Sequence, residues 1–446
     1  MIRKLLFVFV LVSLLHDAYG QIAATMTLWK DSAMGAIWNE ATNTVAYGKP
    51  DASGHWKIYL SDSLGNNETS LTWPAWQSDR HQWAEEWDPT GQYLICYIEK
   101  NQYVMESDHT RVPEDAIPGY GAYCDIWMIK RDGSMAWQLT NLPNDYDNGV
   151  CHGAMSPDGT RFAWTERIQA PNIWDPNLAA GAYVFKVADI VYGPNPALNN
   201  IQTYQPGNVL AGGEVESISP DNSTIAVYST FESQNIVATP LYTIDLATGA
   251  TTKLTTLSFS QCPTYTPDGY HFVYMTGDHC DVFPWSLQGA DWWYMDADSS
   301  NKVRLTYMNV TGHPQCENAY RLAGSLSFMS QTCFLGGIMT QSFGLGGYTA
   351  KVEYSNVLGI GENIPEVVTS VYPNPASNQL NVNFSLQSGP VVWNIFNSAG
   401  QVVLTGTDEI RNGVLTPVNV TPLPAGLYSI QLSTQEGNCT ARFAKN

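Results

Sequence analysis

The chain has 446 residues, and its 21 Lys and Arg against 41 Asp and Glu give a formal net charge of −20 at pH 7. This excess of acid argues against a nucleic-acid-binding protein, because such a surface needs clustered basic residues to neutralise phosphates. Hydrophobic residues make up 44% of the chain, enough to bury a large core and to exclude disorder as the main state. The length allows two or three domains, although a repetitive β architecture can fill the same length as one.

The N-terminus has the pattern of an export signal. Arg3 and Lys4 precede an apolar run over residues 5–15, and the small residues of Ala18-Tyr19-Gly20 follow. This pattern predicts a signal peptide over residues 1–20 that is cleaved before Gln21. The run is too short to cross a bilayer of roughly 30 Å as a helix, and no later segment is longer, so we expect no transmembrane segment.

The eight cysteines all follow this signal, in the part of the chain that an oxidising compartment would receive. The chain has no Cys-x-x-Cys pair, which argues against zinc-ribbon and thioredoxin-like sites. Sequence-local disulfides are expected for three pairs: Cys124 with Cys151, Cys262 with Cys280, and Cys316 with Cys333. Buried free thiols are the alternative, and for Cys96, inside an apolar strand pattern, they are the favoured interpretation.

Four segments repeat one pattern, in which an aromatic residue is followed 13 residues later by the Thr of a Leu-Thr pair. The pairs are Tyr59 and Thr72, Trp127 and Thr140, Tyr242 and Thr255, and Trp293 and Thr306. Turn residues such as Asp132-Gly133 lie between alternating apolar residues, as in a β-hairpin. The pattern predicts a repeated hairpin.

A second repeated element, a Pro-containing turn, precedes these hairpins. Its members are Asp88-Pro89-Thr90-Gly91, Ser156-Pro157-Asp158-Gly159, Ser219-Pro220-Asp221-Asn222 and Thr266-Pro267-Asp268-Gly269. Pro fixes φ for a turn and Gly or Asn accepts a left-handed conformation, so each element predicts a tight reversal between two strands. Two strands and a hairpin give four strands per unit, the construction of a β-propeller blade.

These motifs resemble those of the TolB-like propeller family. The Ser-Pro-Asp-Gly turn and the segment Asp125-Ile126-Trp127 with Asp132-Gly133 carry the resemblance, which covers residues 21–356. It implies an all-β fold with six blades, or seven as the alternative, and it implies no particular activity. The third hairpin, over residues 183–204, and the last blade depart from the pattern. We expect a strand over residues 22–28 to close the ring by pairing with the last blade.

The pattern changes after a linker-like stretch over residues 357–370. Residues 371–446 have alternating strands and Gly turns, which predict a small β-sandwich. The elements Tyr372-Pro373-Asn374-Pro375, Ser398-Ala399-Gly400-Gln401 and Leu423-Pro424-Ala425-Gly426 resemble the C-terminal sorting domain of type IX secretion. The resemblance implies the secretion machinery as a partner, passage across a Bacteroidota-type outer membrane, and a secreted or cell-surface protein. The alternative is a carbohydrate-binding-like sandwich that the mature protein keeps.

No complete catalytic motif occurs in the chain: it has no Gly-x-Ser-x-Gly, no His-Glu-x-x-His and no phosphate-binding Gly-x-x-x-x-Gly-Lys. Candidate ligand-binding residues lie where a propeller places its axis, just before the Pro-containing turns. They are Arg80, His81, Trp83, Glu85, Glu86, His152, Glu214, Glu216, His313 and Glu317. His81, His152 and His313 could hold a divalent metal together with Glu216. A hydrated channel without metal is the alternative, so no cofactor is certain.

The favoured function is a binding module for a glycan or peptide at this axial mouth, without catalysis. The alternative is a metal-dependent lyase or hydrolase of oligouronates, with Glu85 or Glu86 as acid or base, only one of which would face the channel of a regular strand. A structural scaffold is a third class. Trp76 and Trp83 are expected to be the most exposed tryptophans, able to stack on sugars or peptides. The acidic string Asp278, Asp281, Asp291, Asp296 and Asp298 matches no calcium loop and is expected to be a solvated face.

Overall fold

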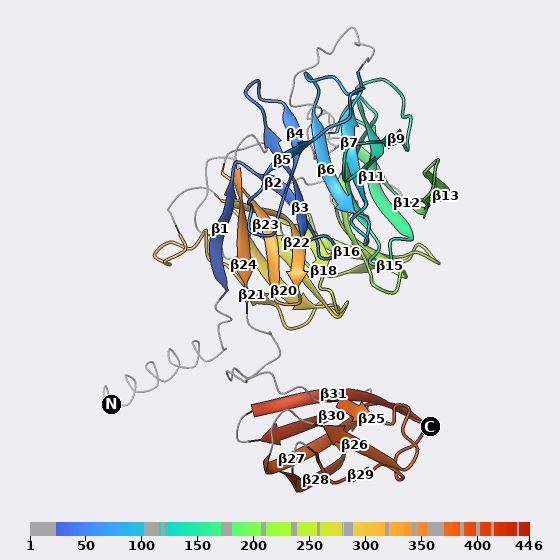
Figure 1. Ribbon diagram of the computed structural model, residues 1–446, viewed down its shortest axis with the longest axis vertical. Helices are drawn as coiled ribbons and strands as arrows, with labels where there is room; N and C mark the ends of the chain where they lie inside the picture. The colour runs from blue at the N-terminus through green and yellow to red at the C-terminus, as the bar shows by residue number, and fades with distance from the viewer. Residues whose placement is uncertain are drawn as a thin grey trace. The chain divides into compact units, whose positions relative to one another are not determined.

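The computed structural model (Figure 1) divides the chain into two compact units, Gln21–Val357 and a second unit that contains Leu358–Asn446. The units are described separately. The structure describes residues 24–101, 116, 121–170, 181–206, 211–232, 239–256, 259–278, 280, 289–316, 321–340, 347–354, 370–383, 388–397, 402–411, 414–434 and 437–446. The predicted signal peptide over residues 1–20 lies outside the described residues.

The described strands of the larger unit form six four-stranded sheets. The first sheet contains β2 (Met34–Asn39), β3 (Thr44–Pro50), β4 (Trp56–Ser61) and β5 (Thr69–Leu71). The second contains β6 (Gln82–Trp87), β7 (Tyr93–Glu99), β8 (Cys124–Lys130) and β9 (Ala136–Gln138). The third contains β10 (Gly149–Met155), β11 (Arg161–Gln169), β12 (Ala182–Val191) and β13 (Ala197–Tyr204). The next two are β14 (Gly213–Ile218) to β15 (Thr224–Ser229), β16 (Leu241–Asp245) and β17 (Thr251–Lys253), and β18 (Ser260–Tyr265) to β19 (His271–Thr276), β20 (Asp291–Asp296) and β21 (Val303–Arg304). The last has the order β1 (Thr25–Asp31), β24 (Gly347–Glu353), β23 (Cys333–Met339) and β22 (Leu322–Ser330).

The repeated motifs occupy the predicted places. The hairpins are the outer strand pairs β4–β5, β8–β9, β16–β17 and β20–β21. The Thr of the Leu-Thr pair has a defined role, since its hydroxyl accepts a hydrogen bond from the main-chain N–H at the start of the hairpin. Thr140 accepts from Ile126 at 2.9 Å, Thr255 from Leu241 at 2.9 Å and Thr306 from Trp292 at 3.0 Å. This bond explains the fixed spacing.

The Pro-containing turns connect the first and second strands of their sheets, as predicted. In one of them the Gly159 N–H donates to the Ser156 carbonyl at 2.8 Å, and Gly159 has φ of 72°. Such a φ favours glycine because a side chain would be strained there. The third hairpin departs from the pattern by its length, with 10 residues in β12 and 8 in β13.

The expected closing strand is confirmed. The N-terminal strand β1 pairs antiparallel with β24, with Thr25 opposite Glu353, and so completes the last sheet. β1 also reaches the first sheet, where Lys30 Nζ lies 3.0 Å from the Glu68 carboxylate. Figure 1 shows β1 in blue beside β24 in orange, although more than 300 residues separate them in the chain.

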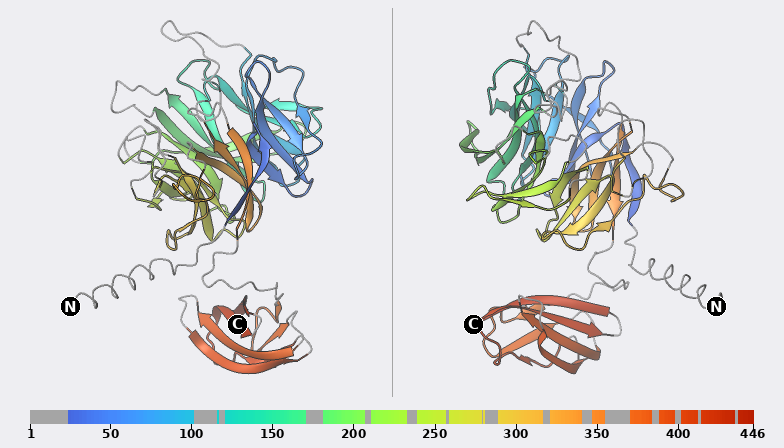
Figure 2. Two further views of the ribbon diagram at one scale, coloured as in Figure 1. Left: turned by 90° about the vertical axis from the view of Figure 1, so that its left-hand side faces the viewer. Right: turned by 180° about the vertical axis from the view of Figure 1, so that it is seen from behind.

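The sheets form a propeller. One edge strand of each sheet contacts the corresponding strand of the next sheet, in the order β2, β6, β10, β14, β18 and β22, and β22 contacts β2. We call them the innermost strands. Figure 2 shows from two further sides that the sheets succeed one another in chain order until the last meets the first. Apolar side chains such as Trp164 and Trp292, 1% and 0% exposed, form the cores of the sheets.

The second unit is a β-sandwich, as predicted. Its described strands are β25 (Ser370–Tyr372), β26 (Gln379–Asn383), β27 (Ser388–Asn397), β28 (Val402–Arg411), β29 (Val418–Asn419), β30 (Gly426–Thr434) and β31 (Gly437–Lys445). They form a three-stranded sheet, β25-β26-β29, and a four-stranded sheet, β28-β27-β30-β31. Buried residues such as Leu380 and Ile430 pack in one core. The described part of the protein contains no helix long and apolar enough to cross a membrane.

The three predicted disulfides are wrong. Cys124, Cys262, Cys280 and Cys333 are free thiols, and each predicted pair contains at least one of them. Their sulfur atoms have other neighbours: the Cys124 thiol donates to the Ala116 carbonyl at 3.4 Å, and Cys262 Sγ lies 3.8 Å from Ser325 Oγ. Cys96 is a buried thiol, as expected.

Candidate binding site at the propeller axis

A β-bulge interrupts each of the innermost strands that the structure describes. The register against the second strand shifts between Met34 and Ile37, Ala84 and Glu86, Cys151 and Gly153, Val215 and Ser217, Gln261 and Thr264, and Ala323 and Leu326. A bulge leaves one or more residues outside the ladder and redirects their side chains, and bulges recur beside functional sites. The repeated bulge therefore marks one level of the propeller axis.

The bulged residues divide this level into two arcs. On three successive strands the bulged residue is ionisable: Glu85 on β6, His152 on β10 and Glu216 on β14. On the other three strands small or weakly polar residues occupy the bulges: Cys262 and Pro263, Gly324 and Ser325, and Gly35 and Ala36. Charge is thus concentrated on one side of the axis.

His152 lies between two of the carboxylates. Its Nδ1 is 3.8 Å from Glu85 Oε1 and its Nε2 is 3.9 Å from Glu214 Oε2. The His152 side chain is 20% exposed, against 5% for Glu85 and 11% for Glu214. Of these three side chains the imidazole is the most exposed. We call Glu85, Glu86, His152, Glu214 and Glu216 the axial cluster.

Main-chain and tyrosine donors fix two of these carboxylates. The Gly153 N–H donates to Glu85 Oε1 at 2.5 Å, and the Tyr228 hydroxyl donates to Glu214 Oε2 at 2.5 Å. Position 153 has no room for a side chain, because a Cβ there would lie 2.5 Å from Tyr97 Oη. Gly153 thus allows β10 to approach Tyr97 of β7 closely.

Two polar atoms in this region lack a partner. Glu216 Oε1 and Tyr97 Oη are buried and make no hydrogen bond of normal geometry among the described residues. Tyr97 is only 3% exposed, and its hydroxyl lies beside Gly153 and the carboxyl of Glu85. The Glu85 carboxyl lies beside Tyr97 and the Cys262 thiol beside Glu216, and both oxygens can accept a further hydrogen bond.

The electrostatics reflect the crowding of carboxylates. Burial raises the pKa of Glu85 to about 7, and burial together with the Glu85 charge raises the pKa of Glu86 to about 8. Burial also raises the pKa of Glu216, and the His152 charge moderates this rise. For His152 burial alone would lower the pKa, but Glu214, Glu216 and Glu85 outweigh it and raise the pKa to about 9. The cluster therefore keeps protons at neutral pH to limit repulsion.

Glu85 and Glu86 do not alternate as they would in a regular strand. The sequence expectation that only one of them faces the channel assumed an unbroken β6, whereas the bulge lies at Glu85 itself. Glu85 contacts His152 and Gly153 on the next blade, while Glu86 Oε1 accepts a hydrogen bond from the Trp87 N–H at 3.2 Å. The structure thus assigns the contacts across blades to Glu85.

Three predicted residues just before β6 and at its start, Arg80, His81 and Trp83, have other partners. Arg80 pairs with Asp79 at 3.0 Å. His81 is 3% exposed, and its Nδ1 accepts a hydrogen bond from the Trp56 N–H at 3.2 Å. Trp83 packs on Trp56 with ring centroids 5.0 Å apart. The expectation of an exposed tryptophan pair is wrong, since Trp76 and Trp83 are 7% and 9% exposed.

The metal hypothesis gains no support. The His313 ring stacks on Tyr307, with centroids 4.4 Å apart, and its Nδ1 accepts a hydrogen bond from the Gln315 N–H. Among the described residues no three His, Cys, Asp or Glu side chains are arranged to hold a metal ion. Glu317, also predicted here, lies outside the described residues.

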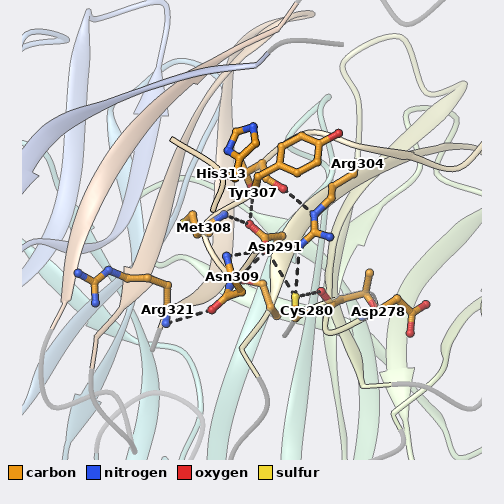
Figure 3. A network of polar contacts seen from close by, with 12 residues as sticks. Asp278, Cys280, Asp291, Arg304, Tyr307, Met308, Asn309, His313 and Arg321 are labelled. Atoms are coloured by element: carbon orange, nitrogen blue, oxygen red, sulfur yellow. Dashed lines mark hydrogen bonds and ion pairs between the residues drawn. The ribbon is translucent and has the colours of Figure 1, made fainter. Parts of the chain in front are cut away.

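A second polar group, built around Asp291 on β20, is buried more deeply (Figure 3). The Asp291 carboxylate is 0% exposed, which corrects the expectation that this aspartate belongs to a solvated face. Arg304 donates to its Oδ2 at 2.6 Å, and the Met308 N–H donates to its Oδ1 at 2.7 Å. Thr306, Asn309 and the Cys280 thiol also donate to this carboxylate.

The same arrangement occurs in another blade, which identifies its role. Asp125, at the equivalent place on β8, accepts from Thr140 at 3.0 Å and from the Leu142 N–H at 2.9 Å, and Lys100 supplies the cation. Both aspartates tie the end of an outer hairpin to the strand on which it folds. The Asp291 group is therefore structural.

A hollow of about 400 Å³ lies on the outer rim, lined by Asn43, Thr44, Leu60, Ser61, Asp62, Asn67, Thr69, Arg131 and Asp132. Its carboxylate Asp62 already accepts from the Leu64 and Asn66 N–H groups and from Asn67 Nδ2 within its own turn. Because this carboxylate is satisfied, the axial cluster remains the stronger candidate.

Sequence reasoning found the five members of the axial cluster and missed Tyr97, Tyr228 and Gly153. Two signals in the sequence point to the bulges, namely a glycine inside the β10 pattern at Gly153 and a proline inside the β18 pattern at Pro263. An isolated Gly or Pro within a strand pattern is typical of a bulge.

Comparison with known proteins assigns the smaller unit. A family described as a secretion system C-terminal sorting domain matches residues 370–446. The chain therefore carries the sorting domain of type IX secretion and is exported to the cell surface or the medium. No curated protein sequence matches the chain.

Solved structures resemble the propeller. TolB from Acinetobacter baumannii has a TM-score of 0.41 at 13% identity, over 72% of this chain and 65% of that one. A putative TolB from Agrobacterium tumefaciens has a TM-score of 0.43 at 14% identity, over 75% of this chain and 99% of that one. A puromycin-hydrolyzing peptidase of Mycobacterium tuberculosis has a TM-score of 0.42 at 12% identity, over 82% and 61%. The chain spans less than two thirds of the first and third of these proteins.

Proposed function

We propose that this exported propeller is a binding module that holds a glycan or peptide ligand at the axial cluster. The observation that carries the proposal is the repeated bulge, which brings ionisable side chains from three successive blades to one level of the axis. Ligands of closed β architectures bind where such side chains converge at the mouth of the ring.

The state of the cluster supports this assignment. Buried carboxylates in a finished structural network have donors for their oxygens, as Asp291 does. In the axial cluster Glu216 Oε1 has none of normal geometry, and the one imidazole lies among three carboxyl groups, those of Glu85, Glu214 and Glu216. An arrangement of this kind is unfavourable for the free protein and becomes favourable when a ligand supplies the missing groups.

One observation favours an enzyme as the second candidate. Glu85, whose pKa burial raises to about 7, lies beside the imidazole of His152, and a carboxyl group with a pKa near neutrality suits general acid–base catalysis. The metal-dependent lyase form of this candidate lacks a ligand set among the described residues. An acidic cluster would also repel an oligouronate.

A direct test is binding of the purified full chain to peptide and glycan arrays, beside a His152→Ala/Glu216→Gln double variant. Glu353→Gln is a matched control, because it removes one carboxylate from an exposed ion pair with Lys351 on the outer strand β24. We expect array ligands to bind the native chain and the control and to be lost in the double variant. Ligands that bind all three proteins equally would refute an axial site.

Incubation of the array ligands with the native chain separates the two candidate functions. Recovery of unchanged ligand supports a binding module. Formation of a new product that Glu85→Gln abolishes would establish the enzyme instead, and metal analysis of the same samples would decide whether that enzyme needs a metal.

A further inference from the structure

We propose that the ligand of the axial cluster is a peptide and that the ammonium group of a lysine side chain enters the cluster. This inference rests on the proposed function and names its ligand class. Three features support it: the charge of the cluster, the buried oxygens there that lack a hydrogen bond of normal geometry, and the scarcity of exposed tryptophan.

The charge of the cluster is the first argument. Three carboxyl groups, those of Glu85, Glu214 and Glu216, lie around one imidazole, and among the described residues none of the three pairs with a Lys or Arg. Arg167, on the neighbouring strand β11, donates instead to the main-chain carbonyls of Tyr146 and Asp147. A cation on the ligand would supply the positive charge that no Lys or Arg of the described residues gives to these carboxyl groups.

The second argument is that two buried oxygens, Glu216 Oε1 and Tyr97 Oη, have no hydrogen bond of normal geometry. An ammonium group has three N–H donors and no acceptor, so it needs several oxygen atoms from different directions. Glu216 Oε1 on β14 and Tyr97 Oη on β7 are buried oxygens without a hydrogen bond of normal geometry, and Glu85 and Glu86 offer carboxylate oxygens on β6. Acceptors from three strands suit the compact ammonium of lysine better than the planar fork of arginine.

The surroundings favour a peptide over a glycan. Sugar rings are commonly held on exposed aromatic faces, yet Trp76 and Trp83 are buried and no tryptophan is among the large hydrophobic residues exposed in the described part of the chain. A lysine side chain needs no such platform, because its apolar stem is thin and its charged end provides the contact.

Proton release accompanies binding in this scheme. The groups that face one another here are Glu85, Glu86, Tyr97, Cys151, His152, Glu214, Glu216, Tyr228, Cys262 and Ser325. Burial and mutual repulsion keep Glu85 and Glu86 partly protonated near neutral pH, since their pKa values are raised to about 7 and 8. An entering ammonium favours the ionised carboxylates, so about one proton leaves per ligand bound.

Titration calorimetry of the full chain tests the inference with three probes: acetyl-Gly-Lys-Gly-amide, its Nε-acetyl-lysine form and acetyl-Gly-Glu-Gly-amide. We expect the lysine peptide to bind at least about tenfold more tightly than either of the others, because only it carries the charge-assisted hydrogen bonds. Buffers of different ionisation enthalpy should report proton release. Equal affinity for the lysine and acetyl-lysine peptides would overturn the proposal.

Single-residue variants test which side chains contact the lysine peptide. Glu216→Gln should weaken the lysine peptide by at least about tenfold, and Tyr97→Phe, which keeps the ring and removes only the hydroxyl, by a smaller factor. Glu353→Gln should bind as the native chain does. If Glu216→Gln does not fold, the Tyr97→Phe variant still decides, since an unchanged affinity there contradicts the proposed contact.

The last probe in the binding experiment is an oligosaccharide of glucosamine, which also carries ammonium groups. Tighter binding of this glycan than of the lysine peptide would replace the peptide by an amino-sugar ligand and overturn the class proposed here. Array ligands that need the axial cluster but show no preference for an ammonium group would refute this inference and leave the binding function intact. Absence of any ligand that depends on the cluster would refute both.

Discussion

Asp291 and the axial glutamates are both withdrawn from water, and they differ in what surrounds them. Asp291 has Arg304 as a counter-charge and five further donors around its two oxygens (Figure 3). The axial glutamates share one imidazole, and one of their oxygens has no donor of normal geometry. The satisfied carboxylate stabilises its blade, whereas the axial carboxylates have fewer donors and are the group for which we propose a ligand.

The largest effect is expected from removing the Asp291 carboxylate, whose oxygens have a full set of donors. Asp291→Ala leaves Arg304 buried without its counter-charge, so the free energy of unfolding should fall by about 3–5 kcal/mol in chemical denaturation. Asp298→Ala, in the exposed turn of the same hairpin, is the control and should change it by less than about 0.5 kcal/mol. A loss at Asp291 no larger than at Asp298 would contradict the structural role.

Gly153→Ala should have the next largest effect, because a Cβ at this position meets Tyr97 Oη at 2.5 Å and the Ala163 carbonyl at 2.7 Å. We expect a loss of about 1–3 kcal/mol in the free energy of unfolding and weaker ligand binding. Gly337→Ala is the matched control, since its Cβ would lie 3.4 Å from the nearest atom, the flexible end of Met34. Equal losses in the two variants would show that the close approach of Gly153 to Tyr97 has no special importance for stability.

The pH dependence of stability sharpens the comparison. The pKa of Glu86 is raised in the folded protein to about 8 and that of His152 to about 9, so the folded state binds more protons than the unfolded state between about pH 5 and 9. Stability should therefore fall by about 1–2 kcal/mol as the pH rises through this range. Thermal unfolding at pH 5, 7 and 9 measures the fall, and Glu86→Gln should flatten it. A stability that rises with pH would contradict the raised pKa values.

The smallest effect is expected from reduction. Cys124, Cys262, Cys280 and Cys333 are free thiols, so a reducing agent has none of the three predicted disulfides to break. The melting temperature of the purified protein should change by less than about 1 °C. A fall of several degrees, as the loss of a native disulfide produces, would restore one of these pairs.

The fold could be predicted because its signals are local and repeated. The Leu-Thr pairs and Pro-containing turns each correspond to one hydrogen-bonded element, such as the Thr140 hydroxyl on the Ile126 N–H or the Gly159 turn. These elements recur, so the strand order within a blade follows from the sequence. The pairing of β1 with β24 was also predictable, because an incomplete last blade needs a further strand.

The site could be predicted only in part, because it depends on small departures from regular strands. The position just before a Pro-containing turn predicted His152 and Glu216 as axial residues, and the structure places both at bulges of the innermost strands. The bulges then decide which neighbours meet, as at Glu85 and Glu86. His81 and Trp83 were selected by their place in the chain, yet each has a buried partner in the first blade, Trp56. Such partners are distant in sequence and leave no local pattern.

The closing strand has a consequence for how the chain folds. Thr25 pairs with Glu353, so the last blade cannot be completed until nearly the whole propeller has been made. Contacts between residues so far apart slow folding and leave unpaired strand edges exposed in the meantime. In this chain the sorting domain at residues 370–446 follows β24 closely. Synthesis therefore supplies β24, the partner of the closing strand β1, just before the segment that directs export, and a chain cut short before β24 lacks both.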